Sequence, residues 1–363
     1  MAPPKAKPGV LQITPYAGSE VGSGGADRIV ISSNESAFGP SWRAMEAYSA
    51  SSEEMHRYPE IDARSLRLAL AEHHGLEVER IICGCGSDQL IDLLALAYAG
   101  PGDEAIYSEH GFTMYPIATR GVGATPVAAP ETNLTADVDA ILERVNERTK
   151  IVFLANPNNP TGSYLGDDAL RRLHAGLPED VLLVLDAAYA EYVVAPDYDP
   201  GIALVREASN VVMTRTFSKI YALASLRVGW AYGPAEIIEI LDRVRPPFNV
   251  STPAIAAGIA ALDDTEHTAR SRDLNAELLP WFTSEVEGMG LTVNPSVGNF
   301  VIIHFDPDGD RNAEAAYRFL FERGIVTRRV AGYGLPDWVR MSIGTRKEMQ
   351  SVLDALRAFV EGA

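Results

Sequence analysis

Residues Thr214–Gly229 read TRTFSKIYALASLRVG and continue a strand-like apolar run. The run leads into a polar turn with Thr216, Ser218 and Lys219, and Arg227 lies eight residues beyond the lysine. Lysine is rare in this chain, which has it only at positions 5, 7, 150, 219 and 347. An amine among apolar neighbours loses its proton more readily and becomes a nucleophile that can form a Schiff base. Two hydroxyls and an arginine beside it suit a phosphate; a surface lysine on a loop is the alternative interpretation.

Apolar runs that alternate with helical segments surround this stretch. Val181–Asp186 (VLLVLD), Lys150–Ala155 and Asn210–Thr214 are apolar on both faces. Such strands, alternating with helices, are typical of a mainly parallel sheet covered by helices. The sequence therefore predicts an α/β fold in which residues 41–264 form a large domain.

The alternation stops at Arg245–Pro253, RPPFNVSTP. A long helical region at about 253–288 follows, and then short strands and helices that end in an amphipathic helix. This pattern predicts a smaller α+β domain at residues 265–363. Residues 1–40 are predicted to form an N-terminal arm with a glycine-rich hinge at 18–25. This arm is expected to contribute to the small domain and to pack on a partner subunit.

The composition narrows the class of protein. The formal net charge is −18, and no basic run could displace the counterions of a nucleic acid. No stretch reaches the roughly 18 uncharged apolar residues of a membrane span, and the start, MAPPKAKPGV, lacks the apolar core of a secretory signal. We therefore expect a cytoplasmic protein that binds neither nucleic acid nor membrane. Cys83 and Cys85 lack a second ligand pair for zinc, so no metal site is predicted, and both are expected to be small buried side chains.

Residues 83–89, CGCGSDQ, lie between a predicted strand and a predicted helix. Gly84 and Gly86 permit close approach of a ligand to the backbone, and Ser87 and Asp88 open the helix with unpaired N–H groups, as in an anion site. An ordinary capped turn is the alternative. A dinucleotide fingerprint requires a third glycine, and this chain has Gln89 instead.

Two further motifs follow predicted strands. Residues 156–162, NPNNPTG, form a turn that places Asn159 at the carboxyl edge of the sheet, where α/β proteins bind ligands. Asp186 ends the run VLLVLD and precedes Tyr189. A partly buried carboxylate there could pair with a cationic ring nitrogen, although a simple strand-end cap is the alternative.

These motifs occur in the order glycine-rich turn, asparagine, aspartate, lysine and arginine. In this order the chain resembles the pyridoxal-phosphate aminotransferases of fold type I, most closely the histidinol-phosphate aminotransferases. The resemblance extends from TPY at 14–16 to RMSIGTR at 340–346. It rests on NPNNPTG, on the D-x-x-Y of residues 186–189, and on Ser218–Lys219 with Arg227.

The resemblance implies pyridoxal phosphate as the cofactor. Lys219 would join it as a Schiff base and later move a proton between Cα and C4′. Asp186 would keep the pyridine nitrogen protonated and so maintain the ring as an electron sink. The other cofactor contacts would be Asn159 and Tyr189 at the phenolic oxygen, Phe112 on the ring face, and Gly86, Ser87, Asp88, Thr216, Ser218 and Arg227 around the phosphate.

The resemblance also implies the substrate contacts and the assembly. Arg340 and Arg328 resemble arginines that hold anionic groups of the substrate, with a surface salt bridge as the alternative for each. Tyr16 resembles a residue near the substrate phosphate. Tyr58 resembles a residue that reaches into the neighbouring subunit's site, which implies a homodimer.

The chain departs from this family at three places. Glycines are common where it has Ala222 and Ser225, and RGPF is common where it has RPPF at 245–248. These departures leave the cofactor set intact and leave the amino donor open.

The implied activity is a ping-pong transamination in histidine biosynthesis, in which histidinol phosphate and 2-oxoglutarate give imidazole-acetol phosphate and glutamate. The closest alternative is an aromatic-amino-acid aminotransferase on the same fold. Further alternatives are a decarboxylase of a phosphate-bearing substrate, a non-catalytic pyridoxal-phosphate-sensing module and a nicotinamide oxidoreductase. Gln89 argues against the last of these.

Overall fold

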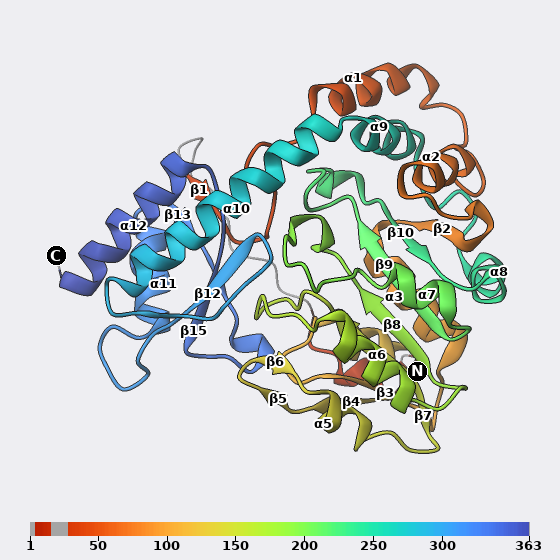
Figure 1. Cartoon of the computed structure of the whole chain (residues 1–363), viewed down its shortest axis with the longest axis horizontal. Helices are drawn as coiled ribbons and strands as arrows, with labels where there is room; N and C mark the ends of the chain where they lie inside the picture. The colour runs from red at the N-terminus through yellow and green to blue at the C-terminus, as the bar shows by residue number, and fades with distance from the viewer. Residues whose placement is uncertain (1–3, 16–27, 363) are drawn as a thin grey trace.

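The larger part of the molecule is built on a seven-stranded sheet, as the computed structural model shows for the described residues, 4–15 and 28–362 (Figure 1). In spatial order its strands are β2 (Ile81–Gly84), β10 (Gly229–Tyr232), β9 (Val211–Thr216), β8 (Leu182–Asp186), β7 (Thr149–Ala155), β3 (Glu104–Ser108) and β4 (Thr125–Ala129). β10 is antiparallel to both neighbours, whereas the pairs from β9 to β4 are parallel. The predicted mainly parallel sheet is confirmed.

Helices cover both faces of this sheet because its central strands are apolar on both sides. Every residue of β8 and of β9 is buried. Leu182 and Val184 pack into one apolar cluster and Leu183 and Leu185 into another, as the period of two along a strand requires. The first cluster includes residues of α3 (Gly86–Tyr98), α4 (Met114–Val122) and α8 (Ala235–Val244). The second includes residues of α2 (Arg64–His74), α5 (Val138–Leu142), α6 (Asp167–Gly176), α7 (Ile202–Glu207) and α9 (Thr252–Asp263).

A smaller antiparallel sheet forms the other part, at the left of Figure 1. Its strands, in order, are β11 (Thr292–Val293), β12 (Phe300–His304), β15 (Trp338–Ser342) and β14 (Arg328–Arg329). A separate apolar cluster joins it to α10 (Thr265–Glu287), α11 (Ala313–Glu322) and α12 (Arg346–Glu361). β1 (Ile29–Val30) pairs in parallel with β13 (Ile325–Val326), and Ile31 lies in the same cluster. Residues 29–31 therefore pack on the C-terminal part.

The helical region expected at about 253–288 is divided into α9 and α10. α9 ends at Asp263, and Asp264 caps α10 by accepting a hydrogen bond from the backbone N–H of His267 at 3.3 Å. An aspartate at this position favours a new helix start over continuation. The closing helix is confirmed, and Thr345 and Glu348 form a capping box at its start.

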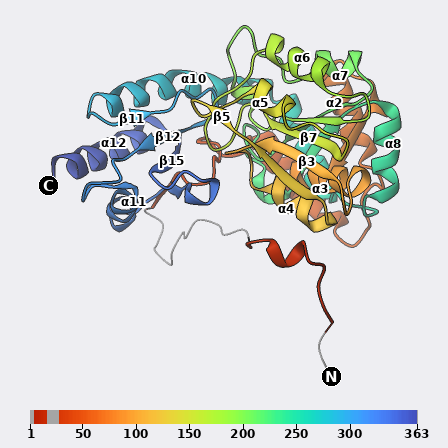
Figure 2. The same cartoon turned by 90° about the horizontal axis from the view of Figure 1, so that it is seen from below.

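The described N-terminal residues 4–15 lie outside the body and extend away from it toward the N-terminus (Figure 2). They contain the short η1 (Val10–Gln12). The remaining short elements are α1 (Trp42–Ala50), η2 (Ser51–Glu54), η3 (Val78–Arg80), β5 (Glu131–Thr132), β6 (Thr135–Ala136), η4 (Ala190–Tyr192), η5 (Ala224–Leu226) and η6 (Ala331–Tyr333). Within the described ranges, no helix has the length and apolar character needed to traverse a membrane.

Candidate active site

A cavity of about 430 Å³ opens where the carboxyl ends of β7, β8 and β9 meet the start of α3. Side chains that follow neighbouring parallel strands converge at this edge, which is where ligands bind in open α/β sheets. Of the side chains expected at the site, the cavity is lined by Ser87, Asp88, Phe112, Asn159, Asp186, Tyr189, Thr216, Ser218, Lys219, Arg227, Arg328 and Arg340. Ser32, Ser33 and Asn34 add a wall from the segment that follows β1.

One end of the cavity is suited to bind an anion, and we call it the anion cradle. It is formed by the first turn of α3 and by the loop after β9, where Arg227 donates from Nη1 to Ser218 Oγ at 3.3 Å and from Nη2 to Asp88 Oδ2 at 3.0 Å. Thr216 Oγ1 lies 3.0 Å from Ser218 Oγ and also accepts from the backbone N–H of Ser218. Unpaired N–H groups at a helix start and a guanidinium together favour a phosphate.

Two glycines keep this cradle open. A Cβ on Gly86, which has φ +79°, would lie 2.5 Å from Nη2 of Arg227. A Cβ on Gly229 would lie 2.5 Å from the backbone nitrogen of Ser87. Any larger residue at either position would displace the groups that face the anion. Gly86 therefore shapes the cradle from behind without lining the cavity.

The opposite end of the cavity holds a buried carboxylate. Asp186 is 4% exposed; Oδ2 accepts from the hydroxyl of Tyr115 at 2.9 Å and Oδ1 from the hydroxyl of Thr214 at 3.2 Å. Burial raises the pKa of Asp186 to about 6, and the two hydroxyl donors oppose this rise. Burial and the adjacent Asp186 raise the pKa of Tyr115, so its hydroxyl stays protonated and remains a donor. This end is suited to hold a cationic group in a dry environment.

Lys219 also lines this cavity. Its neighbours Phe217 and Ile220 are fully buried and anchor the turn after β9. Nζ donates to the backbone carbonyl of Ser33 at 3.0 Å and lies 5.7 Å from the centre of the Tyr189 ring. The turn therefore presents the amine to the cavity, as the sequence predicted.

The small sheet supplies cations to the open side of the site. Arg340 is 5% exposed and donates to Asn159 Oδ1 and to the backbone carbonyl of Ser32, the latter at 2.6 Å. Its Nε has no hydrogen-bond partner among the residues that the structure describes. Arg328 lies directly opposite Arg340 in the β14–β15 register. Two arginines on adjacent strands, one with unused donor capacity, are suited to bind an anionic substrate.

Several contacts were not foreseen from the sequence. Tyr115 and Thr214 hold Asp186, and Asn34 donates from Nδ2 to the hydroxyl of Tyr189 at 2.9 Å. Thr214 shares the predicted alternation of β9 with Thr216, which was an available signal, since both point to the same face. Tyr115 and Asn34 lie far from their partners in sequence and gave no such signal.

Three further sequence-based expectations remain. Tyr58 is 83% exposed and stacks on Phe248, with the ring centres 4.7 Å apart. Tyr16 lies outside the described residues. Cys83 is buried as expected, but the expectation for Cys85 is wrong: it is exposed, because it stands at the turn where the chain leaves β2 for α3.

The fold and the site together define an α/β enzyme with a lysine and a buried carboxylate in one anion-binding cavity. Residues 26–356 match the family described as aminotransferase class I and II, and the chain belongs to this family. It is 55% identical to the histidinol-phosphate aminotransferase of Rhodospirillum centenum over the full length of both chains. It is 53% identical to the enzyme of that name from Paramagnetospirillum magneticum, over 99% of each chain. Its structure is also similar to a crystal structure, that of histidinol-phosphate aminotransferase from Sinorhizobium meliloti in complex with pyridoxal-5'-phosphate. The two align over 99% of each chain, with a TM-score of 0.91 and 29% identity.

Proposed function

We infer that this chain is a pyridoxal-phosphate-dependent aminotransferase that transfers an amino group from histidinol phosphate to 2-oxoglutarate. Relatives named histidinol-phosphate aminotransferase align along its whole length at more than half identity. The observation that carries the proposal is the position of Lys219, whose Nζ lies in a cavity with an anion cradle at one end and a buried carboxylate at the other.

The residues present fit pyridoxal phosphate. The cradle kept open by Gly86 and Gly229 suits its phosphate, and the buried Asp186 suits a protonated ring nitrogen. Phe112 contributes an aromatic surface to the same cavity and makes an edge contact with Tyr115, which fixes its plane. A cavity of about 430 Å³ is within the usual range for a small-molecule site.

When bound, the cofactor supplies an aldehyde that joins an amine and a ring that accepts electrons from the adjacent carbon. Lys219 Nζ takes the proton from Cα of the substrate and later returns one, since it is the amine on the cavity wall. Asp186 stabilises positive charge on the ring nitrogen, because it is buried and held by two hydroxyl donors. Asn159 and Tyr189 orient the ring oxygen.

The substrate end carries two cations that suit two anionic partners. Arg340 and Arg328 bind the phosphate of histidinol phosphate in one half of the reaction and a carboxylate of 2-oxoglutarate in the other. Tyr16 remains a proposed contact of the substrate phosphate. The overall exchange converts histidinol phosphate to imidazole-acetol phosphate and 2-oxoglutarate to glutamate, a step of histidine biosynthesis.

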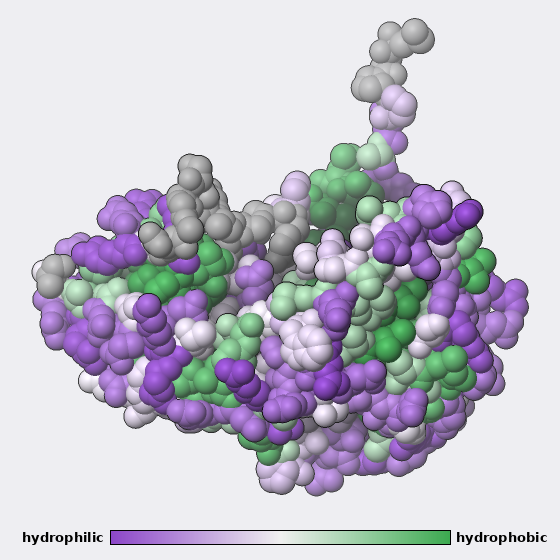
Figure 3. All heavy atoms as spheres, turned by 90° about the horizontal axis from the view of Figure 1, so that it is seen from above, coloured by the Kyte–Doolittle hydropathy of each residue, from purple (hydrophilic) through white to green (hydrophobic). Residues whose placement is uncertain are grey.

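We propose that the enzyme is a homodimer in which Tyr58 of one subunit reaches the site of the other. The support is a run of large exposed apolar side chains along α1, η2 and the loop after them, namely Trp42, Met45, Tyr48, Met55, Tyr58 and Ile61. The space-filling view from above shows hydrophobic areas, in green, among hydrophilic ones, in purple (Figure 3). Burial of such side chains against a second copy is favourable.

We also propose a large domain at residues 41–264, a small domain at 265–363 and a contribution of residues 1–40 to the small domain. α10 begins at Thr265, and the small sheet has an apolar cluster of its own. A cytoplasmic location is proposed on the ordinary composition and on the two unpaired cysteines.

A panel of amino donors with 2-oxoglutarate tests the assignment of the substrate. We expect kcat/KM for histidinol phosphate to exceed the values for phenylalanine and tyrosine. A tenfold preference for either aromatic acid would instead support the aromatic-amino-acid aminotransferase. Release of carbon dioxide would support the decarboxylase, and turnover that persists in Lys219→Ala would exclude this mechanism.

A further inference from the structure

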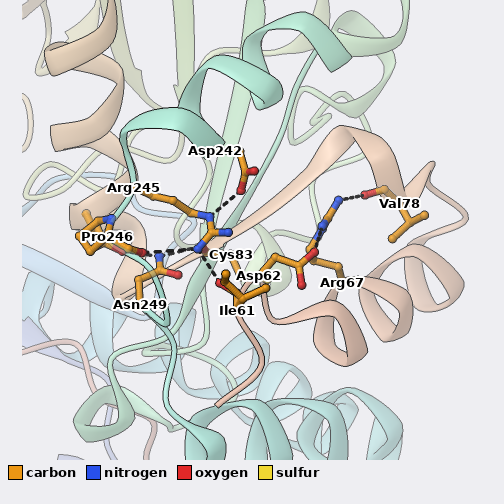
Figure 4. Close-up of polar contacts among 10 residues, drawn as sticks. Ile61, Asp62, Arg67, Val78, Cys83, Asp242, Arg245, Pro246 and Asn249 are labelled. Atoms are coloured by element: carbon orange, nitrogen blue, oxygen red, sulfur yellow. Dashed lines mark hydrogen bonds and ion pairs between the residues drawn. The ribbon is translucent and has the colours of Figure 1, made fainter. Parts of the chain in front are cut away.

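The segment 245–249, RPPFN, connects α8 to α9 and touches two loops that are distant in sequence. Figure 4 shows Arg245, Pro246 and Asn249 of this segment beside Ile61 and Cys83, which Arg245 and Asn249 contact. The catalytic roles assigned above use none of these residues. We name residues 245–249 the bracket.

The first contact of the bracket is with the loop behind the anion cradle. Nδ2 of Asn249 donates to the backbone carbonyl of Cys83 at 3.1 Å and to Oε1 of Gln89 at 2.7 Å. The same Oε1 accepts from the backbone N–H of Cys85 at 2.8 Å. Both amide hydrogens of Asn249 and both lone pairs of Gln89 Oε1 are therefore used. These bonds fix the chain on both sides of Gly84, directly before the Gly86 turn that faces Arg227.

The second contact is with the loop that carries Tyr58. Arg245 donates from Nη1 to the backbone carbonyl of Ile61 at 2.6 Å, and its Nε is paired with Asp242 at 2.6 Å. The ring of Phe248 stacks on the ring of Tyr58 at 4.7 Å. The backbone of Phe248 has φ +59°, which an aromatic residue adopts only where its surroundings enforce it.

A separate pair fixes the far end of the Tyr58 loop. Arg67 on α2 is paired with Asp62 at 2.5 Å and donates to the backbone carbonyl of Val78 at 2.9 Å (Figure 4). The side chain of Arg67 is 14% exposed and that of Arg245 is 7% exposed, so solvent screens neither strongly. Arg245 and Phe248 are thus the contacts through which the bracket itself sets the position of this loop.

We propose that the 245–249 bracket holds the anion cradle and the Tyr58 loop in a fixed position relative to each other. Asn249 and Gln89 are then positioning residues for the cradle. The inference rests on the proposed function in one respect, since it takes the ligand of the cradle to be the phosphate of pyridoxal phosphate. In the proposed homodimer, the bracket then connects the cradle of one subunit to the tyrosine that enters the site of the other.

The test uses Asn249→Leu and Gln89→Leu, which remove these hydrogen bonds at similar volume. Gln89→Glu is the conservative variant, because a carboxylate oxygen still accepts from Cys85 and Asn249. Asn146→Leu is the matched control: Asn146 Nδ2 also donates twice, to Glu104 at 2.7 Å and to the backbone carbonyl of Arg144 at 3.1 Å. Asn146 lies in the loop before β7, and β10, β9 and β8 separate β7 from β2 in the sheet.

Two quantities are measured on each full-length protein. The first is the dissociation constant of pyridoxal phosphate after the cofactor has been removed and titrated back. The second is hydrogen–deuterium exchange of the holoenzyme in peptides that cover residues 57–62 and 83–90. We expect Asn249→Leu and Gln89→Leu to weaken cofactor binding about tenfold and to speed exchange in both peptides. Asn146→Leu should stay within about twofold of the wild type in both quantities. Gln89→Glu should do so in exchange, whereas its added negative charge near the anion cradle lowers cofactor affinity by itself.

Faster exchange in only one of the two peptides, or unchanged cofactor affinity in both leucine variants, would overturn the proposal. Equal effects in Asn146→Leu would also overturn it, since the change would then be general destabilisation. A failure of the proposed function is distinguishable, because it would be seen as absent transamination in the wild type, whereas these readouts compare variants without reference to turnover.

Discussion

The charged groups at the two ends of the cavity differ in their exposure to solvent. At the anion cradle, the side chains of Arg227 and Asp88 are 43% and 41% exposed, and their ion pair is screened by solvent. At the other end Asp186 is 4% exposed, and its charge depends on two hydroxyl donors. An ion pair between exposed side chains can break for a ligand at a small cost in free energy. An ionised buried carboxylate destabilises the protein until a cation pairs with it. The deep end should therefore dominate catalysis and the exposed end should dominate reversible binding.

The largest expected effect is that of Asp186→Asn. The substitution removes the proposed buried partner of the cationic ring. Removal of one partner of a buried ion pair typically costs about 4 kcal/mol, so kcat/KM should fall about 10³-fold. Steady-state kinetics with histidinol phosphate measure this effect. Asp180→Asn is the control, because Asp180 is an exposed partner of Lys150 and its loss should change kcat/KM less than twofold. A loss below tenfold in Asp186→Asn would remove the distinction between the two ends.

The same variant should stabilise the cofactor-free protein. Burial raises the pKa of Asp186 from 3.8 to about 6, so the folded state binds this proton more tightly than the unfolded state does. The stabilising contribution is complete below pH 4 and is lost as the pH rises through 6, which amounts to about 3 kcal/mol. Asp186→Asn should therefore raise the free energy of unfolding at pH 7.5 by up to about 3 kcal/mol and leave it unchanged near pH 4. Urea unfolding at both pH values measures the difference.

A smaller effect is expected for Arg340→Gln at the substrate end. Arg340 has a donor without a partner in the described part of the chain, and a charged hydrogen bond to substrate is worth about 2 kcal/mol. KM for histidinol phosphate should rise about 30-fold, while cofactor affinity changes less than threefold. Arg329→Gln is the control, because Arg329 follows Arg328 in β14 and is paired with Glu314 of α11. A large loss of cofactor in Arg340→Gln would place this residue at the wrong end of the cavity.

Tyr115→Phe should have a modest, pH-dependent effect. Removal of the hydroxyl takes away a donor that holds the pKa of Asp186 down, so that pKa rises further. The acid limb of the kcat/KM profile should move to higher pH by up to about one unit, with a fall in kcat/KM of less than tenfold at pH 8. An unchanged acid limb would show that Tyr115 does not tune Asp186.

The smallest effect is expected for Cys85→Ser. Cys85 is an exposed free cysteine, and its backbone N–H rather than its side chain donates to Gln89. Activity and cofactor affinity should both stay within twofold of the wild type. A larger change would mean that the thiol contributes to the anion end.

The sequence predicted the two ends of the cavity unequally. Nearly all of the anion cradle was predicted, because Gly86, Ser87 and Arg227 belong to short motifs whose backbone geometry is local. Asp186 was also predicted, from its place at the end of a buried strand. Its donor Tyr115 was not, because a contact across 71 residues depends on how α4 packs on the sheet.

The fold shows the same division. The alternation of apolar strands and helices predicted the parallel sheet, since burial on both faces leaves a clear pattern. The break between α9 and α10 was missed, although Asp264 is a recognisable helix start. The contact between Tyr58 and Phe248 could not be predicted, because it joins a segment that precedes β2 in the sequence to one that follows it much later.

Reduction with borohydride tests the central claim most directly. If Lys219 is the amine that joins pyridoxal phosphate, reduction of the native enzyme makes the link permanent, and peptide mapping should place one cofactor per chain on Lys219. Lys150→Ala should retain the label and Lys219→Ala should lose it. A label on any other lysine, or none in the active wild-type enzyme, would contradict the account.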